Sequence, residues 1–202
     1  MVLVTKTHTL VCQVLLMSIC VGLTTLCTAR EPPKTRTPPV NMYDLMIDAS
    51  VFPQSWELWH GPDPIPEQER RERESLYVVF RYEGLEPGIV GARHAVFRYR
   101  NEADAATSFS RHGFLNRHVI TPWAVPDEWS YESPFADRFK FACAEIDILG
   151  SYWRCEAVGQ HDEFISVFYT VLSPEYMTLE DVERILVAID ERMAFYLGKD
   201  TQ

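Results

Sequence analysis

The chain has 202 residues, of which 47% are hydrophobic and 24% charged, a composition typical of a folded globular protein. Its formal net charge is −10, and because residues 1–40 carry a local +3, residues 41–202 carry −13. An acidic body repels phosphate backbones, and no lysine- and arginine-rich stripe alternates with aromatic residues, so we expect no nucleic-acid partner.

Residues 10–26 form an uncharged, apolar run. The run is slightly long for the apolar part of a signal peptide and slightly short for a membrane span, so its length leaves both open. Small residues up to Ala29 suit cleavage there, whereas Leu26 before Cys27 does not suit lipid attachment. Positive charges after the run oppose export, but its position at the N-terminus is typical of an export signal. We expect residues 1–29 to be a signal peptide or a single membrane-anchor helix; a helix buried in a soluble core is the alternative.

Residues 30–41 contain four prolines and no apolar periodicity. Such a segment favours a stiff, extended and solvated spacer. We therefore expect a linker at 30–41, followed by an extracytoplasmic α+β domain at 42–200 that is membrane-anchored or secreted.

The first part of this domain is expected to be an irregular lead-in. Residues 51–66 are rich in aromatic residues and proline, and they predict a segment that lays Phe52, Trp56 and Trp59 on the core. Residues 67–74 form a charged run that indicates a short solvated helix or loop. Apolar residues at period two then predict strands at 76–82 and 92–100, the second with Ala95 and Phe97 on one face.

Two helices with recognisable ends separate and follow the remaining strands. Asn101 and Gly113 suit the N-cap and the end of the first helix, and Thr178 and Gly198 suit those of the second. Strands are expected at 138–148, 152–158 and 163–172. The sequence thus predicts an α+β fold with an antiparallel sheet of about five strands, in the order β-β-α-β-β-β-α. We expect its helices on one face and a hydrophobic helix before it.

Two cysteines lie in the predicted domain, Cys143 and Cys155, on either side of a predicted hairpin turn at 149–150. If the turn is centred there, residues whose numbers sum to about 298 face each other, and these two cysteines do so. An exported domain permits a disulfide between them. Two separate buried thiols are the alternative.

The sequence holds no motif that indicates a cofactor, a metal centre or a nucleophilic catalyst. The histidines show no ligand spacing, although His60, His112 and His118 could converge on a metal. Glu145 and Asp147 share one side of a strand, as an acid/base or cation-binding pair requires. Exposed side chains without chemistry explain both groups more simply, so we expect no cofactor, no metal and no enzymatic activity.

Residues 118–136 form a long, non-periodic connection with a high aromatic content. Long connections in compact domains are often functional, and tryptophan and tyrosine often anchor interfaces. The candidate surface for a partner or ligand comprises Trp123, Trp129, Tyr131 and Phe135, together with Trp56 and Trp59. The alternative is a loop that covers a sheet face or edge and buries its own aromatic side chains.

The stretches "FPQSWEL", "VFRYRNEADAATSF", "YWRCEAVGQHDEFISVFY" and "TLEDVERILVAIDERM" resemble a class of small bacterial exported or membrane-tethered α+β domains. The resemblance covers about residues 50–195 and implies a fold and a location.

The sequence favours a protein-binding accessory subunit of a membrane complex, with no cofactor of its own; electron-transfer complexes of respiration or photosynthesis are examples. The membrane contact would be made by residues 10–26 if they are not cleaved. An exported protein that binds a small apolar ligand, with a pocket between the sheet and residues 123–135, is the alternative. An enzyme with a dispersed site is the third hypothesis.

Overall fold

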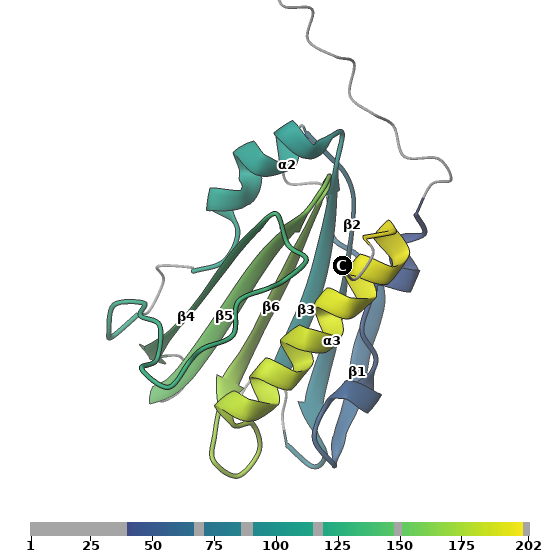
Figure 1. The fold of residues 1–202 in the computed structure, drawn as a ribbon. Helices are drawn as coiled ribbons and strands as arrows, with labels where there is room; N and C mark the ends of the chain where they lie inside the picture. Colours follow the sequence, from purple (N-terminus) through teal and green to yellow (C-terminus); the bar gives the residue numbers. More distant parts are fainter. Residues whose placement is uncertain (1–39, 67–70, 86–90, 115–118, 148–150, 200–202) are drawn as a thin grey trace, which may run out of the picture. The chain divides into compact units, whose positions relative to one another are not determined.

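An antiparallel sheet of six strands forms the centre of the protein, in the order β1-β2-β3-β6-β5-β4 (Figure 1). The strands are β1 (Trp56–Pro64), β2 (Glu72–Tyr82), β3 (Gly91–Tyr99), β4 (Arg138–Asp147), β5 (Ser151–His161) and β6 (Phe164–Leu172). The computed structural model describes residues 40–66, 71–85, 91–114, 119–147 and 151–199. The α+β class and the antiparallel sheet are confirmed, while the expected segment 1–29 and nearly all of the linker lie outside the described residues.

The long C-terminal helix α3 (Leu179–Leu197) has the ends that its sequence predicts. Thr178 and Asp181 form a reciprocal capping box, and Gly198 ends the helix in the left-handed conformation with a φ of 64°. Within the described ranges, no helix is long and apolar enough to cross a membrane.

The second helix, α2 (Glu102–Ser108), is capped by Asn101, whose side chain accepts a hydrogen bond from the Asp104 backbone N–H. It is shorter than the sequence predicts, because the chain tightens into the 3-10 helix η4 (Phe109–Arg111) before the left-handed Gly113.

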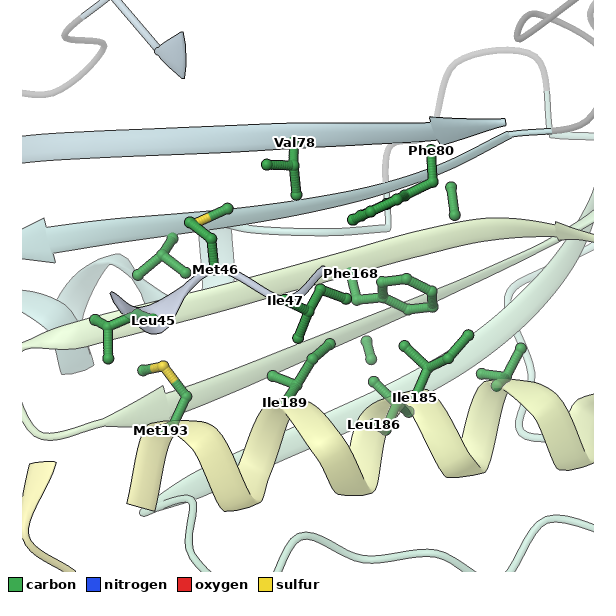
Figure 2. Close-up of a cluster of buried hydrophobic side chains, with 14 of the residues drawn as sticks. Leu45, Met46, Ile47, Val78, Phe80, Phe168, Ile185, Leu186, Ile189 and Met193 are labelled. Atoms are coloured by element: carbon green, nitrogen blue, oxygen red, sulfur yellow. The ribbon is translucent and has the colours of Figure 1, made fainter. Parts of the chain in front are cut away.

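The main core lies between α3 and one face of the sheet (Figure 2). Even-numbered positions of β2, β3 and β6 point to this face, and two short 3-10 helices, η2 (Met42–Leu45) and η3 (Ala49–Val51), complete the layer. Figure 2 shows how the buried side chains meet, among them Leu45, Met46, Ile47, Val78, Phe80, Phe168, Ile185, Leu186, Ile189 and Met193.

A second, smaller core lies on the opposite face, which corrects the expectation that the helices share one face. Ala105 of α2 is buried there with odd-numbered residues of β3, including Phe97 and Tyr99. The physical reason is visible in β3 itself, where His94, Ala95, Val96 and Phe97 are all buried. A strand that is buried on both faces needs a cover on each.

β1 corrects the expected irregular lead-in and accounts for the sixth strand. Trp56–Pro64 pairs with β2, although the register shifts twice along the pair. Its prolines are tolerated because β1 is an edge strand, where a missing N–H need not interrupt a ladder. Phe52 and Trp56 are buried as expected, but the side chain of Trp59 is 49% exposed.

Candidate functional site

The β4–β5 hairpin places Cys143 and Cys155 directly opposite each other, in the predicted register, and they form a disulfide. The backbone N–H and C=O of Cys143 bond to Ala124 and not to β5. The cysteines therefore occupy a non-hydrogen-bonded pair, where side chains on neighbouring strands approach most closely, and their Cα atoms are 4.0 Å apart. Both side chains lie in the main core.

The long aromatic connection covers part of the outer edge of β4. The Ile120 backbone N–H donates to the Glu145 carbonyl, and Ala124 and Cys143 exchange two backbone hydrogen bonds. These contacts occupy outward-facing backbone groups that would otherwise be open to another strand.

Two aromatic residues of this connection pack onto the main core. The Trp129 ring stacks on Phe141 with 3.7 Å between ring centroids, and its Nε1 donates to the Tyr131 carbonyl. The Tyr131 ring meets Phe139 edge to face, and its hydroxyl donates to the Asp190 carboxylate of α3. These rings occupy part of the space between connection and sheet in which the hypothesis of an apolar ligand places its pocket.

The structure does not bring the six expected surface residues together. Trp123 and Phe135 are partly buried, and the Phe135 carbonyl accepts a hydrogen bond from Lys199. Trp56 is buried beside β2 and donates its Nε1 hydrogen to the Tyr176 carbonyl. β1 and β4 are opposite edges of the sheet, so Trp59 lies at the edge away from the aromatic connection. Of the six, only Trp59 is more than partly exposed.

A buried polar group under α3 was not expected. His94 and His161 are both fully buried, and their burial lowers the pKa of each to about 3. His161 Nε2 lies 3.4 Å from Asp190 Oδ1. Burial raises the pKa of Asp190, and its hydrogen bonds from Ser133 and Tyr131 partly offset that effect. Asp190 could have been noticed in the sequence, because it interrupts the apolar face of α3.

The geometry of this group does not suit nucleophilic catalysis. His94 Nε2 lies 3.0 Å from Ser166 Oγ, but its Nδ1 accepts the Ile47 backbone N–H at 3.5 Å. Nε2 therefore carries the ring proton and donates to the hydroxyl, whereas a general base must accept from it. Ser166 itself is only 4% exposed, so substrate cannot reach it.

The candidate metal site formed by three histidines gains no support. His60 and His112 bond to different tyrosines, Tyr77 and Tyr99, and His118 lies outside the described residues. Within the part of the chain that the structure describes, no three potential ligands gather in a way that could hold a metal ion.

A feature that the sequence reasoning missed lies on the sheet face opposite α3. We define the open face as the side chains Tyr77, Val79 and Arg81 of β2, Arg93 of β3, Val167, Tyr169 and Val171 of β6, and Arg154 of β5. Each keeps part of its surface exposed, whereas Val78 and Phe168, which are neighbours that point to the main core, are at most 2% exposed. Among the described residues, α2 and the chain up to Phe114 cover one end of this sheet face (Figure 1). Tyr77 and Val167 border the second core there, and the eight side chains remain partly exposed.

Arginine and tyrosine alternate across the open face. The Arg93 guanidinium lies over the Tyr77 ring at 4.4 Å, and Arg154 lies over Tyr169 at 4.0 Å. Arg93 and Tyr169 are also direct cross-strand neighbours. Planar guanidinium groups held against aromatic rings are pre-organised for further contacts and are enriched where proteins bind one another.

Both edges of the sheet are poorly suited to accept another strand. Pro62 and Pro64 remove backbone donors from β1, and its two register shifts distort the edge. The opposite edge is occupied in part by the connection at Ile120 and Ala124. An incoming partner would therefore meet a face of the sheet more readily than its edge.

No protein-family model, curated protein or solved structure matches this chain.

Proposed function

We propose that this protein is a non-enzymatic protein-binding domain that docks a partner on the open face. The single observation that carries the proposal is a row of arginine–tyrosine pairs on a sheet face that the described part of the chain leaves partly exposed. Arginine and tyrosine are the residues that most often contribute large binding energies at protein interfaces. In the aromatic connection, by contrast, Trp129 and Tyr131 make internal contacts with Phe141 and Asp190.

We further propose that the domain acts outside the cytoplasm, as an anchored or secreted accessory subunit of a membrane complex. The disulfide between Cys143 and Cys155 supports this location, because disulfides persist mainly in oxidising compartments. The apolar run at 10–26 and the proline-rich spacer at 30–41 support an export signal or an anchor helix that holds the domain away from the membrane.

Site-specific photo-crosslinking tests the binding function. A photoreactive phenylalanine analogue replaces Val79, which lies on the open face beside Arg93 and belongs to neither core. The matched control carries the same analogue at Glu180, an exposed position at the start of α3. In cells that make the full-length protein, we expect a defined crosslinked partner from position 79 and none from position 180. Equal crosslinking from both positions, or none from position 79, would overturn the proposal.

The location is tested independently of the partner. The intact mass and the N-terminal residue of protein isolated from its native membranes separate cleavage, lipidation and retention. A reporter fused to the C-terminus should lie on the extracytoplasmic side, and a cytosolic reporter would rule out the proposed location.

A further inference from the structure

The arginines of the open face differ in whether they have a carboxylate partner. Arg81 Nε lies 2.7 Å from Glu57 Oε1, and an Arg154 amino group lies 2.6 Å from Glu156 Oε1. Arg93 has no carboxylate within ion-pair distance among the residues that the structure describes, although the Tyr77 ring lies against its guanidinium. The face thus keeps one cation that no carboxylate of the described chain neutralises.

The Nε atom of Arg93 is more constrained than the rest of its side chain. It is buried, and the described residues offer it no hydrogen-bond partner. An unpaired buried donor is costly, and a carboxylate that approaches a guanidinium accepts two parallel hydrogen bonds. Because Nε itself is closed to an incoming group, a carboxylate supplied from outside would bind the terminal amino groups of Arg93 and neutralise the unpaired charge.

We infer that the open face binds an acidic segment of a partner protein, with a partner carboxylate on Arg93; this inference rests on the proposed function. Charge complementarity supports it. Glu57 pairs with Arg81 and Glu156 with Arg154, and the third carboxylate on this side of the sheet, Asp63 opposite Tyr77, lies 2.9 Å from His60 Nε2. Arg93 is therefore the arginine of the open face that no described carboxylate neutralises, while residues 41–202 as a whole carry −13. An arginine without a carboxylate attracts an acidic group locally, whereas the acidic body repels acidic surfaces elsewhere.

The same charges argue against a second copy of this chain as the occupant. A two-fold dimer through this face would place the same patch on both sides of the interface. Arginines would then face arginines while the two acidic bodies repelled each other. The valine and tyrosine side chains between the arginines add apolar contact, so the preferred segment carries apolar or aromatic residues beside its carboxylates.

The test combines crosslinking with a charge-neutralising variant. The full-length protein with the photoreactive residue at position 79 is compared with the same protein carrying Arg93→Gln. Arg184→Gln is the matched control, because Arg184 is exposed on α3, where it pairs with Asp181. We expect Arg93→Gln to reduce crosslinking about tenfold or more and Arg184→Gln to leave it unchanged. Mass spectrometry should place the crosslink in a segment that contains several aspartate or glutamate residues.

Defined probes give a second readout on the purified full-length protein in detergent. One labelled peptide alternates glutamate with tyrosine and valine, and its counterpart has glutamine in place of every glutamate. Fluorescence anisotropy should detect binding of the acidic peptide only, about tenfold weaker to Arg93→Gln and progressively weaker as salt is added. Arg93→Lys keeps the charge but loses the two-pronged geometry, so it should bind with intermediate affinity.

The outcomes separate the two proposals. A partner that crosslinks equally to the Arg93→Gln protein, or through a neutral or basic segment, overturns the acidic-segment inference and leaves a protein-binding face. A crosslink between two copies of this chain, or Arg93-dependent binding to phosphatidylserine vesicles without peptide binding, also overturns it. The absence of any crosslink from position 79 overturns the proposed function itself.

Discussion

The buried histidines predict that this protein loses stability when the pH falls from 7.5 to 5.0. Burial lowers the pKa of His94 and of His161 to about 3, whereas an unfolded chain has a histidine pKa of 6.5. Below pH 6.5 the unfolded chain therefore binds protons that the folded protein does not. The stabilisation is complete above pH 6.5 and decreases as the pH falls toward 3.

The linkage relation gives the size of the effect. At pH 5.0 each histidine favours unfolding by about 2 kcal/mol relative to pH 7.5, so the pair contributes about 4 kcal/mol. Asp190, on the side of His161 that faces α3, works in the opposite direction, because its raised pKa lets the folded protein take up a proton first. The positive charges of Arg192 and Lys199 add to the effect of burial in lowering the pKa of His94 and of His161, respectively. The observed loss should therefore be somewhat less than 4 kcal/mol.

Urea unfolding followed by tryptophan fluorescence measures this loss at the two pH values. His94→Gln removes one titrating ring and keeps a polar side chain beside Ser166, so it should remove about half of the pH-dependent loss, even if it lowers stability at pH 7.5. Thr178→Ala removes a helix cap and no histidine, so it should lower the free energy of unfolding equally at both pH values. A wild-type protein that is equally stable at pH 7.5 and 5.0, or a His94→Gln protein that keeps the full pH dependence, would refute the reasoning.

Three further changes test the caps, the bridge and the buried carboxylate, each by urea unfolding at pH 7.5. Thr178→Ala should cost about 1 kcal/mol through the lost capping box, and an unchanged midpoint would contradict the observed cap. Replacing both Cys143 and Cys155 by alanine should cost about 3 kcal/mol, and a protein equally stable with and without reductant would exclude the bridge. Tyr131→Phe should cost about 1–2 kcal/mol and raise the pKa of Asp190 further, since the carboxylate loses its hydroxyl donor; an unmoved Asp190 titration in NMR spectra would contradict this.

Local chemistry in the sequence predicted the parts of the fold that depend on neighbouring residues. A cap is decided within one helical turn, and Thr178 and Gly198 mark the two ends of α3 as expected. A tight hairpin sets the register of its strands, so arithmetic on two residue numbers was enough to pair Cys143 with Cys155.

The parts that were missed depend on contacts between distant segments. The prolines and the glycine of β1 favour an irregular segment, and only pairing with β2 at an edge makes a strand of it. The run of four buried residues from His94 to Phe97 did contain a signal for helices on both faces, because a strand covered on one face alternates instead. The open face had no such signal, since Tyr77, Arg93 and Tyr169 become neighbours only through the order of the strands.

The way in which the faces and edges of the sheet are covered bears on the function. α3 covers one face, prolines and register shifts disrupt one edge, the connection at Ile120 and Ala124 occupies part of the other, and α2 covers one end of the second face. If the remaining area contacted only water, alternating lysine and glutamate side chains would suit it, because they hydrate well and resist association. It carries valine, tyrosine and arginine instead, which hydrate less well and favour contact with other proteins. A surface of that composition, set in an acidic body, is better explained by a partner than by water.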